Sequence, residues 1–306
     1  MPDFVMIASA PHVLQDGSIC YQGLTIMSAQ AQRSNIPVPT SDPAPTPGQK
    51  LALAPAAASF LTEITVEHGP AALLGRFFLS AETAARANGV TVSFAGYDDL
   101  LAINEQNRDT WRPLVPMFHP RYNTFTRDNS IVLLGRNAQG DIVATQAARL
   151  LRLDGTTLYD EAVNLRLHYE HPERDRLPDE ACVVTAEATR KITGTVLLGG
   201  AVWYRPDYRK RGLAAILPRI SRAYAYTRWK TDYTTSMMVA GVAKGGVAAA
   251  SGYTNIEPSI EFRNSPAGDF GLMFVWMQPP ELLADLQVWL DGFSSEVDAT
   301  VTERRA

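Results

Sequence analysis

The sequence predicts an α/β protein of the α+β type, with a mixed central sheet flanked by helices and an N-terminal extension. Strand-like runs alternate with runs of helical spacing from residue 90 to residue 280. The length of 306 residues, with 46% hydrophobic and 20% charged residues, suits one large globular domain. The segment 36–55 is rich in Pro, Ser and Thr, so we expect residues 1–60 to be poorly structured or extended.

The first predicted helix lies in a helical extension, residues 61–89, that should pack on the domain following it. It starts at Pro70 and is followed by Gly89, as is usual for a helix start and stop. Its apolar residues recur at helical spacing: Leu73, Leu74, Phe77, Phe78, Ala81 and Ala85.

The next elements are a strand, a helix and a hairpin. The alternating run "VTVSFAGY" at 90–97 predicts a strand, and a helix should follow it with Asp98 or Asp99 as the capping residue. Two apolar runs around the turn at 139–141 predict a hairpin. We interpret residues 154–193 as an insertion in the core domain, which spans 90–280.

A strand at 194–204 and a helix after Gly212 form the informative part of the chain. The paired glycines Gly199 and Gly200 inside the strand indicate a bulge, or a close approach of a ligand to the backbone. The helix is predicted from the apolar spacing of residues 213–220. Pro218 lies inside it, so we expect a kink there.

The remaining elements complete the domain. The run at 233–241 predicts another strand, 242–251 a weak helix, and 252–262 and 271–278 two further strands. Residues 281–306 are expected to form a C-terminal helix and tail.

The overall charge argues against a nucleic-acid binder, because 28 Lys and Arg stand against 32 Asp and Glu, a net charge of -4. Two cysteines in a chain of this size fit a reducing compartment. No apolar run approaches the roughly 18 residues that a membrane span needs. We therefore expect a cytoplasmic protein without membrane or nucleic-acid partners.

The stretch "YRKRGLAAIL" at 208–217 nevertheless gathers basic residues at one turn. The first N–H groups of a helix have no partners within it, and together with the helix dipole they bind anions. Gly212 permits close approach, while Arg209, Lys210 and Arg211 add positive charge. The patterns of nucleoside-triphosphate and dinucleotide loops are absent from the sequence. These features predict a cradle for a diphosphate.

The residues of this turn resemble the coenzyme-A motif of the GNAT acyltransferase superfamily, [RQ]-x-x-G-x-[GA]. The motif follows "YRPDY" at 204–208, and a later Gly-Tyr pair at Gly252 and Tyr253 is similar to the pair that the family carries before a strand. The resemblance extends over about residues 90–277.

This resemblance implies a sheet that splays near the end of the 194–204 strand, where the pantetheine of acetyl-CoA or another acyl-CoA would lie. The pyrophosphate would lie on the N–H groups of the turn, and no metal is implied. The implied cofactor-binding residues are Val202, Trp203, Tyr204, Arg209, Lys210, Arg211, Gly212, Leu213 and Ala214.

The chain departs from the family at the residues that move protons. Where family members often carry Asn and Tyr, this chain has Gly241 and Ala248. Ser251 and Tyr253 are candidate substitutes for the acid that protonates the leaving thiolate. For the general base, which removes a proton from the acceptor ammonium, the candidates are Glu161, Glu170 and Glu187, and we select Glu187.

Three further stretches have two interpretations each. The loop 111–125 is a rigid cap over the core, or it shapes the acceptor pocket through Trp111, Arg112 and His119. The stretch 168–175, with two histidines and Glu170, is a solvated loop or a zinc site. The aromatic and basic stretch 221–229 is the end of the cradle helix or an RNA-binding surface.

The leading hypothesis is an enzyme, an acyl-CoA-dependent N-acyltransferase that moves acetyl to the primary amine of a small molecule or amino acid. One alternative takes a longer acyl chain from acyl-CoA or acyl carrier protein. Another, of a different class, is a non-catalytic coenzyme-A sensor or binding module. The acceptor, the acyl length and the choice between monomer and homodimer stay open.

Overall fold

The computed structural model describes residues 12–13, 19–20 and 59–303. The prediction for residues 1–60 therefore falls almost entirely outside the described residues. Within that region β1 (His12–Val13) and β2 (Ile19–Cys20) pair antiparallel. The boundaries of the core domain and of its insertion stay predictions.

The core is an eight-stranded mixed sheet with the order β3-β4-β5-β7-β8-β10-β9-β6. The pair β7 and β8 is parallel, and the other neighbouring strands of this sheet are antiparallel. The strands are β3 (Thr91–Phe94), β4 (Ser130–Arg136), β5 (Ile142–Leu153), β6 (Ala181–Val184), β7 (Gly194–Tyr204), β8 (Tyr233–Val239), β9 (Asn255–Ser265) and β10 (Gly268–Met277). The predicted mixed sheet and the hairpin of β4 and β5 are confirmed.

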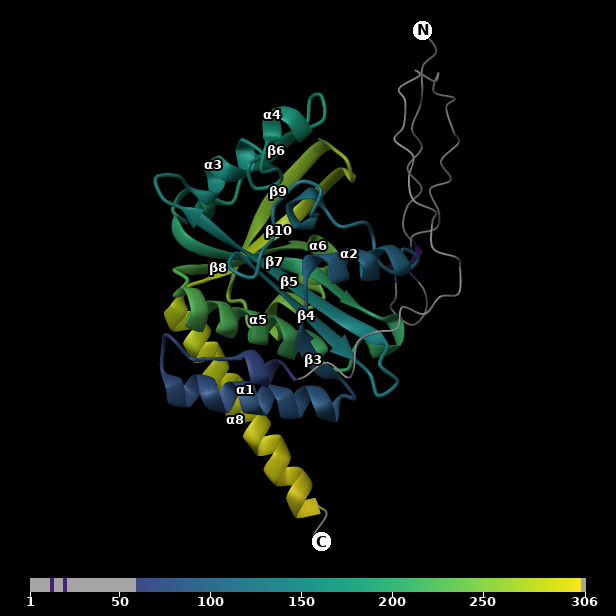
Figure 1. The fold of residues 1–306 in the computed structure, drawn as a ribbon, viewed down its shortest axis with the longest axis vertical. Coiled ribbons are helices and arrows are strands. Elements are labelled where there is room, and N and C mark those ends of the chain that lie inside the picture. The colour runs from purple at the N-terminus through teal and green to yellow at the C-terminus, as the bar shows by residue number, and fades with distance from the viewer. Residues whose placement is uncertain (1–11, 14–18, 21–58, 304–306) are drawn as a thin grey trace. The chain divides into compact units, whose positions relative to one another are not determined.

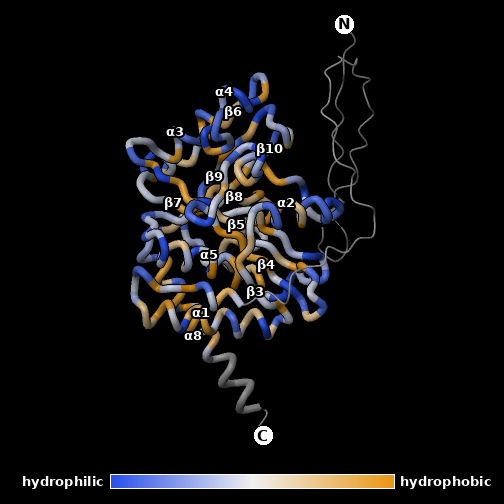
Figure 2. Tube along the Cα trace, in the orientation of Figure 1, coloured by the Kyte–Doolittle hydropathy of each residue, from blue (hydrophilic) through white to orange (hydrophobic). Residues whose placement is uncertain are grey.

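Helices cover the two faces of this sheet, and each face has its own apolar core. In Figure 1, α1 (Ala71–Ala87), α5 (Leu213–Trp229) and α8 (Pro279–Glu303) lie together below the sheet. The other face is covered by α2 (Tyr97–Gln106), the 3-10 turn η2 (Pro116–Phe118) and α3 (Leu158–Val163). Figure 2 shows the hydrophobic stretches concentrated along the central strands and α1.

Helix α1 confirms the prediction for residues 70–88. Five of its six predicted apolar positions are buried, and Leu73 packs partly buried against the same core. The helix contacts α5 and α8. The division of the chain into a helical extension and a core domain stays a prediction.

The cap of helix α2 lies two residues before Asp98, the earlier of the two predicted capping residues, so the predicted cap is wrong. Gly96 is the capping residue and Tyr97 the first helical residue. The Asp99 carboxylate instead accepts the Gly96 N–H at 3.1 Å from inside the first turn. The Tyr97 ring stacks on Phe125 at 3.7 Å between centroids, so the first helical residue is packed in the core.

The weak helix predicted at 242–251 is two short helices. These are α6 (Ala240–Lys244) and α7 (Val247–Ala250), separated by Gly245 and Gly246. Gly246 has a positive φ of 85°, a conformation that favours glycine and interrupts a helix.

Residues 154–193 add an edge to the sheet. They contain α3, α4 (Pro172–Asp175), β6 and the 3-10 turn η3 (Glu187–Arg190). Strand β6 pairs with β9 and becomes the last strand of the sheet.

The splayed sheet implied by the resemblance is confirmed at β7 and β8. Their pairing ends at Gly199 and Ser236, although β7 continues to Tyr204 and β8 to Val239. We call the gap beyond this last pair the opening, and the pair itself its apex. Among the helices that the structure describes, none has the length and apolar content needed to cross a bilayer.

The predicted bulge in β7 lies at the opening. Trp203 pairs with Thr145 and Gly200 with Ala147, so β7 has one extra residue there, and Ala201 has a φ of 48°. A side chain at Gly200 would collide with the Phe118 ring. A glycine is therefore needed at position 200 because the Phe118 ring lies close to the backbone, without any ligand.

Candidate functional site

The predicted cradle is the turn between β7 and α5. Lys210 and Gly212 have positive φ angles of 61° and 77°, and Gly212 is the N-cap of α5. Ala215 donates its N–H to the Gly212 carbonyl at 2.9 Å. Within the described residues, no oxygen accepts the N–H groups of Lys210 to Ala214. The turn therefore presents a row of donors at a helix N-terminus, the arrangement that binds anions.

An aromatic ring supports this turn from below. Tyr208 is buried, and the guanidinium carbons of Arg205 and Arg211 lie 5.0 and 4.3 Å from its ring centroid. Arg211 itself is exposed, as is Lys210. Both cations therefore remain available to an anion at the turn.

Arg209 has a different role in the geometry. Its Nε donates to the Tyr204 carbonyl at 3.2 Å, and its Nη2 donates to the Thr110 carbonyl at 3.4 Å. The side chain thus ties the cradle to the end of β7 and to the loop after α2. The sequence did not predict these contacts of Thr110, and its neighbouring residues carry no motif that would indicate them.

The three predicted pantetheine residues form the β7 side of the opening. Val202 is 43% exposed, and Trp203 is buried and donates its indole N–H to the Thr110 hydroxyl at 3.2 Å. Burial raises the pKa of Tyr204. Because β7 has no β8 partner here, the backbone groups on this edge of β7 have no neighbouring strand to pair with.

Of the three predicted acceptor residues, one contacts the β7 side of the opening. Trp111 stacks on Trp203, with 5.6 Å between centroids and 14° between planes. Arg112 is exposed, and its carbonyl accepts from Asn104 at 2.9 Å. Nδ1 of His119 accepts the Arg121 N–H at 3.1 Å, and burial, aided by Arg121, lowers the His119 pKa.

Ser251 bonds to the cradle helix. It is 1% exposed, and its hydroxyl donates to the Ala214 carbonyl at 3.1 Å. In a regular helix the N–H of residue 218 would serve that carbonyl, but Pro218 has none. Ser251 therefore replaces the bond that the proline removes. Helix α5 continues from Leu213 to Trp229 across Pro218, and the expected kink stays a prediction.

Tyr253 lies in a buried contact between α5 and α8. The Arg222 guanidinium carbon is 4.6 Å from its ring centroid. Burial raises the Tyr253 pKa, while Arg222 opposes that shift. Arg219 donates to both carboxylate oxygens of Asp285 at 2.9 and 2.7 Å, and an Arg222 nitrogen lies 3.4 Å from the same carboxylate.

Glu187 lies away from the cradle. Its side chain is 82% exposed and lies 3.8 Å from Arg190. Turn η3 precedes the start of β7, whereas the cradle follows its end, and this strand spans roughly 30 Å. The structure therefore does not bring Glu187 together with the other candidates.

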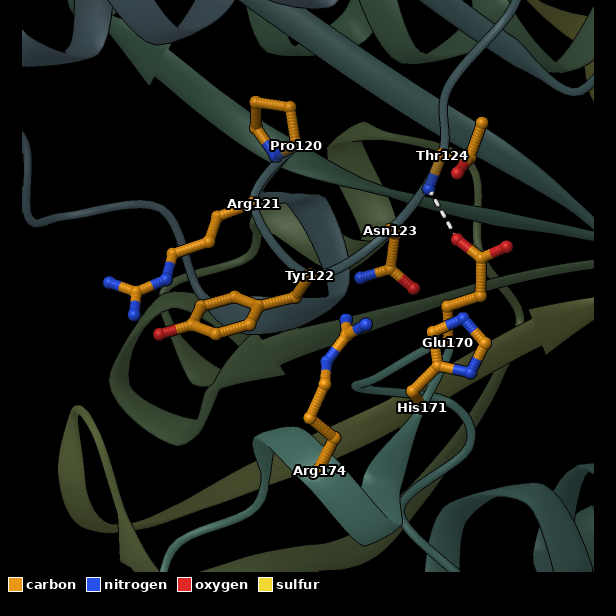
Figure 3. A pocket seen from close by; sticks show the side chains of 8 residues that line it. All are labelled: Pro120, Arg121, Tyr122, Asn123, Thr124, Glu170, His171 and Arg174. Carbon is orange, nitrogen blue, oxygen red and sulfur yellow. Dashed lines mark hydrogen bonds between the residues drawn. The ribbon is translucent and has the colours of Figure 1, made fainter.

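The other carboxylates have partners in their own loops. Glu161 binds Arg166 at 2.8 Å, and Glu170 accepts the Thr124 N–H at 2.9 Å. Glu170 lines a cavity of about 220 Å³ beside α4, and Figure 3 shows its side chain among the other lining residues. Arg174 on its wall is paired with Asp175 at 2.7 Å.

A zinc site at 168–175 finds no support in the described part of the chain. No group of three or more His, Cys, Asp or Glu side chains there could hold a metal. His168 is buried between other groups, and its pKa is lowered to about 3 by burial and by Arg149. Burial raises the pKa of Cys182 to about 12, which disfavours its thiolate. The stretch 221–229 is the end of α5, with its aromatic residues packed against the core.

Comparisons in sequence find no relative, since neither a protein-family model nor a curated protein matches the chain. Comparisons in structure do find similar proteins. Acetyltransferases are among them. A SpeG spermidine N-acetyltransferase from Vibrio cholerae is 10% identical, with a TM-score of 0.38 over 64% of this chain and 96% of that one.

Two other solved structures are similar over comparable lengths. The AAC(6')-Ib structure, in complex with paromomycin and acetyl-CoA, is 12% identical, with a TM-score of 0.37 over 63% of this chain and 95% of that one. An uncharacterised protein from Bacillus halodurans is 11% identical, with a TM-score of 0.39 over 67% of this chain and 91% of that one.

Proposed function

We propose that this chain is a GNAT-type acyl-CoA-dependent N-acyltransferase that moves acetyl from acetyl-CoA to the primary amine of a small molecule. The observation that carries the proposal is the cradle. Its N–H donors at the start of α5 come shortly after β7, the strand that parts from β8 at the opening. Diphosphate and pantetheine are adjacent in coenzyme A, so one ligand fits both features.

The residues of the turn suit the diphosphate. The N–H groups from Lys210 to Ala214 supply donors, and the exposed Lys210 and Arg211 supply charge. A side chain at Gly212 would meet only Asn88, at 4.0 Å, so the space above the turn is open. Arg209 holds the turn on the strand end and contributes its charge from there.

The backbone edge of β7 suits the pantetheine. An extended chain with amide groups can pair with an unpaired strand edge as another strand would. The unpaired stretch runs from Gly200 to Tyr204, and the splay keeps β8 out of reach.

In the reaction, the neutral amine attacks the thioester carbonyl carbon. The C–N bond forms and the C–S bond breaks, and the proton lost from the amine is balanced by the one gained by the sulfur of coenzyme A. A backbone N–H at the opening would stabilise the developing oxyanion. Tyr253 stays a candidate for moving a proton. The bond from Ser251 to Ala214 favours a structural role for that hydroxyl, and Glu187 lies too far from the cradle for this role.

A second candidate, transfer of a longer acyl chain, is favoured by exposed apolar side chains near the opening. Val202 of β7, Val239 of β8 and Val242 of α6 are 43%, 55% and 46% exposed. Aliphatic surface of this kind suits an alkyl chain, because covering it removes apolar area from water.

Titration calorimetry with acetyl-CoA tests the proposal, followed by thiol release over a panel of primary amines. Binding with turnover supports an acetyltransferase. A preference for long-chain acyl-CoA would support the second candidate, and binding without turnover on any amine would support a coenzyme-A sensor. Absence of binding at millimolar acyl-CoA of either kind would exclude all three.

A further inference from the structure

Gln146 lies on β5 at the level of the opening. It pairs with Leu133 of β4. On its other side β7 is bulged, so the β5–β7 register passes from Ala147 to Thr145 without a partner for Gln146. Gln146 therefore lies opposite the bulge of β7, where β7 parts from β8.

The Gln146 amide lies against the apex of the opening. A methyl group placed on Gly199 would be 3.7 Å from Gln146 Nε2 and 3.6 Å from the Thr235 carbonyl on β8. Gly199 is the last residue of β7 that pairs with β8. The amide is thus beside the last residue before the strands part.

The orientation of the amide is set by a bond at its nitrogen. Nε2 donates to the Ala147 carbonyl at 3.0 Å, and a carbonyl can only accept, so the nitrogen must be the atom that faces it. The oxygen Oε1 has no hydrogen-bond partner among the described residues, although Gln146 is only 4% exposed. Buried polar atoms without partners are rare, and each one requires an explanation.

We propose that Gln146 Oε1 accepts a hydrogen bond from a pantetheine amide N–H of the acyl-CoA donor, at the apex of the opening. This inference rests on the proposed function. The unpartnered atom is an acceptor, which matches an N–H donor and excludes the thioester carbonyl as its partner. Pantetheine carries two amide N–H groups, one of them close to its sulfur. Gln146 would thereby fix how deep the thioester reaches into the opening.

Titration calorimetry with two probes tests this, acetyl-CoA and ADP, because ADP has the diphosphate without the pantetheine. Gln146→Met keeps the length of the side chain and removes its polar atoms. We expect the Kd of acetyl-CoA to rise about tenfold, as for the loss of one hydrogen bond. The Kd of ADP should not change. The melting temperature should change little, because the loss of the Nε2 bond to the Ala147 carbonyl is offset by the removal of an unpartnered oxygen from the core. Gln146→Leu repeats the test with a branched side chain.

Ser93→Ala is the matched control. Ser93 is 3% exposed on β3, at the opposite edge of the sheet from β6, and its hydroxyl also lacks a partner among the described residues. Removing it should leave the Kd of both probes unchanged.

Three results would overturn the inference. An unchanged Kd of acetyl-CoA in both Gln146 variants, with normal binding by the wild type, would refute it and leave the cradle standing. An equal rise in the Kd of acetyl-CoA and of ADP, together with a lower melting temperature, would show that Gln146 has a structural role only. Failure of the wild type to bind either probe would refute the proposed function, and this inference with it.

Discussion

At the scale of single residues, Gly212 makes the sharpest prediction. Its φ of 77° disfavours any other residue, and the space above it is open. Gly212→Glu should destabilise the fold by about 1–2 kcal/mol, because a side chain disfavours this φ. It should also raise the Kd of acetyl-CoA about tenfold or more, because the new carboxylate would repel the diphosphate. Denaturant unfolding and calorimetry measure the two effects.

Gly155 supplies the control. It has a φ of 76° and equally open surroundings. It follows the C-terminal end of β5, which is the end away from the cradle. Gly155→Glu should show the same loss of stability with normal affinity. Equal affinities in the two variants would argue against the cradle.

His168 makes a prediction about acid stability. Its pKa is about 3 in the folded protein, against an ordinary value of 6.5, because the ring is buried. Below the ordinary value the unfolded chain binds a proton that the folded one does not, so stability falls as the pH falls. At a pH near 5 the loss should be about 2 kcal/mol.

His168→Leu should remove this part of the acid sensitivity. Urea unfolding at a pH near 7.5 and near 5 measures it, with His171→Leu as the exposed control. If the unfolding free energy of His168→Leu depended on pH as it does in the wild type, other groups would be the cause of the lower stability in acid.

At the scale of elements, α5 depends on a donor from outside the helix. Ser251→Ala should lower stability by about 1–2 kcal/mol, because the partly buried Ala214 carbonyl loses its partner. In a Pro218→Ala background the backbone N–H of residue 218 returns and serves that carbonyl. The same Ser251→Ala change should then have little effect, and a double-mutant cycle of unfolding free energies measures the coupling. Equal losses in both backgrounds would contradict the account.

Helices α5 and α8 are joined through Asp285. Asp285→Ala leaves Arg219 and Arg222 buried without their carboxylate, so we expect a loss of roughly 3–5 kcal/mol in unfolding free energy. Glu261→Ala breaks the exposed pair with Arg263 and should cost no more than about 1 kcal/mol. Similar losses in the two variants would show that the contact of α5 and α8 does not depend on this carboxylate.

At the scale of the molecule, the sequence was most informative where local rules act. Helices α1 and α5, the β4–β5 hairpin and the bulge in β7 follow from spacing and glycine placement. The cap of α2 was misplaced because a carboxylate can serve the N-cap from inside the first turn.

The parts that the sequence could not predict depend on contacts between distant segments. The bond from Ser251 to Ala214 joins residues 37 apart, and β6 finds β9 across about 80 residues. The unpartnered oxygen of Gln146 lies opposite the bulge of β7, which is a contact between two strands. A glutamine inside the apolar run "VATQAARL" is the one sequence signal that could have drawn attention to it.

The most direct test of the central claim is a crystal structure of the chain with acetyl-CoA. The account predicts the diphosphate within hydrogen-bond distance of the N–H groups between Lys210 and Ala214. It also predicts the pantetheine alongside Gly200 to Tyr204 in the opening between β7 and β8. Acetyl-CoA bound elsewhere, with the turn and the opening free of ligand, would contradict the account.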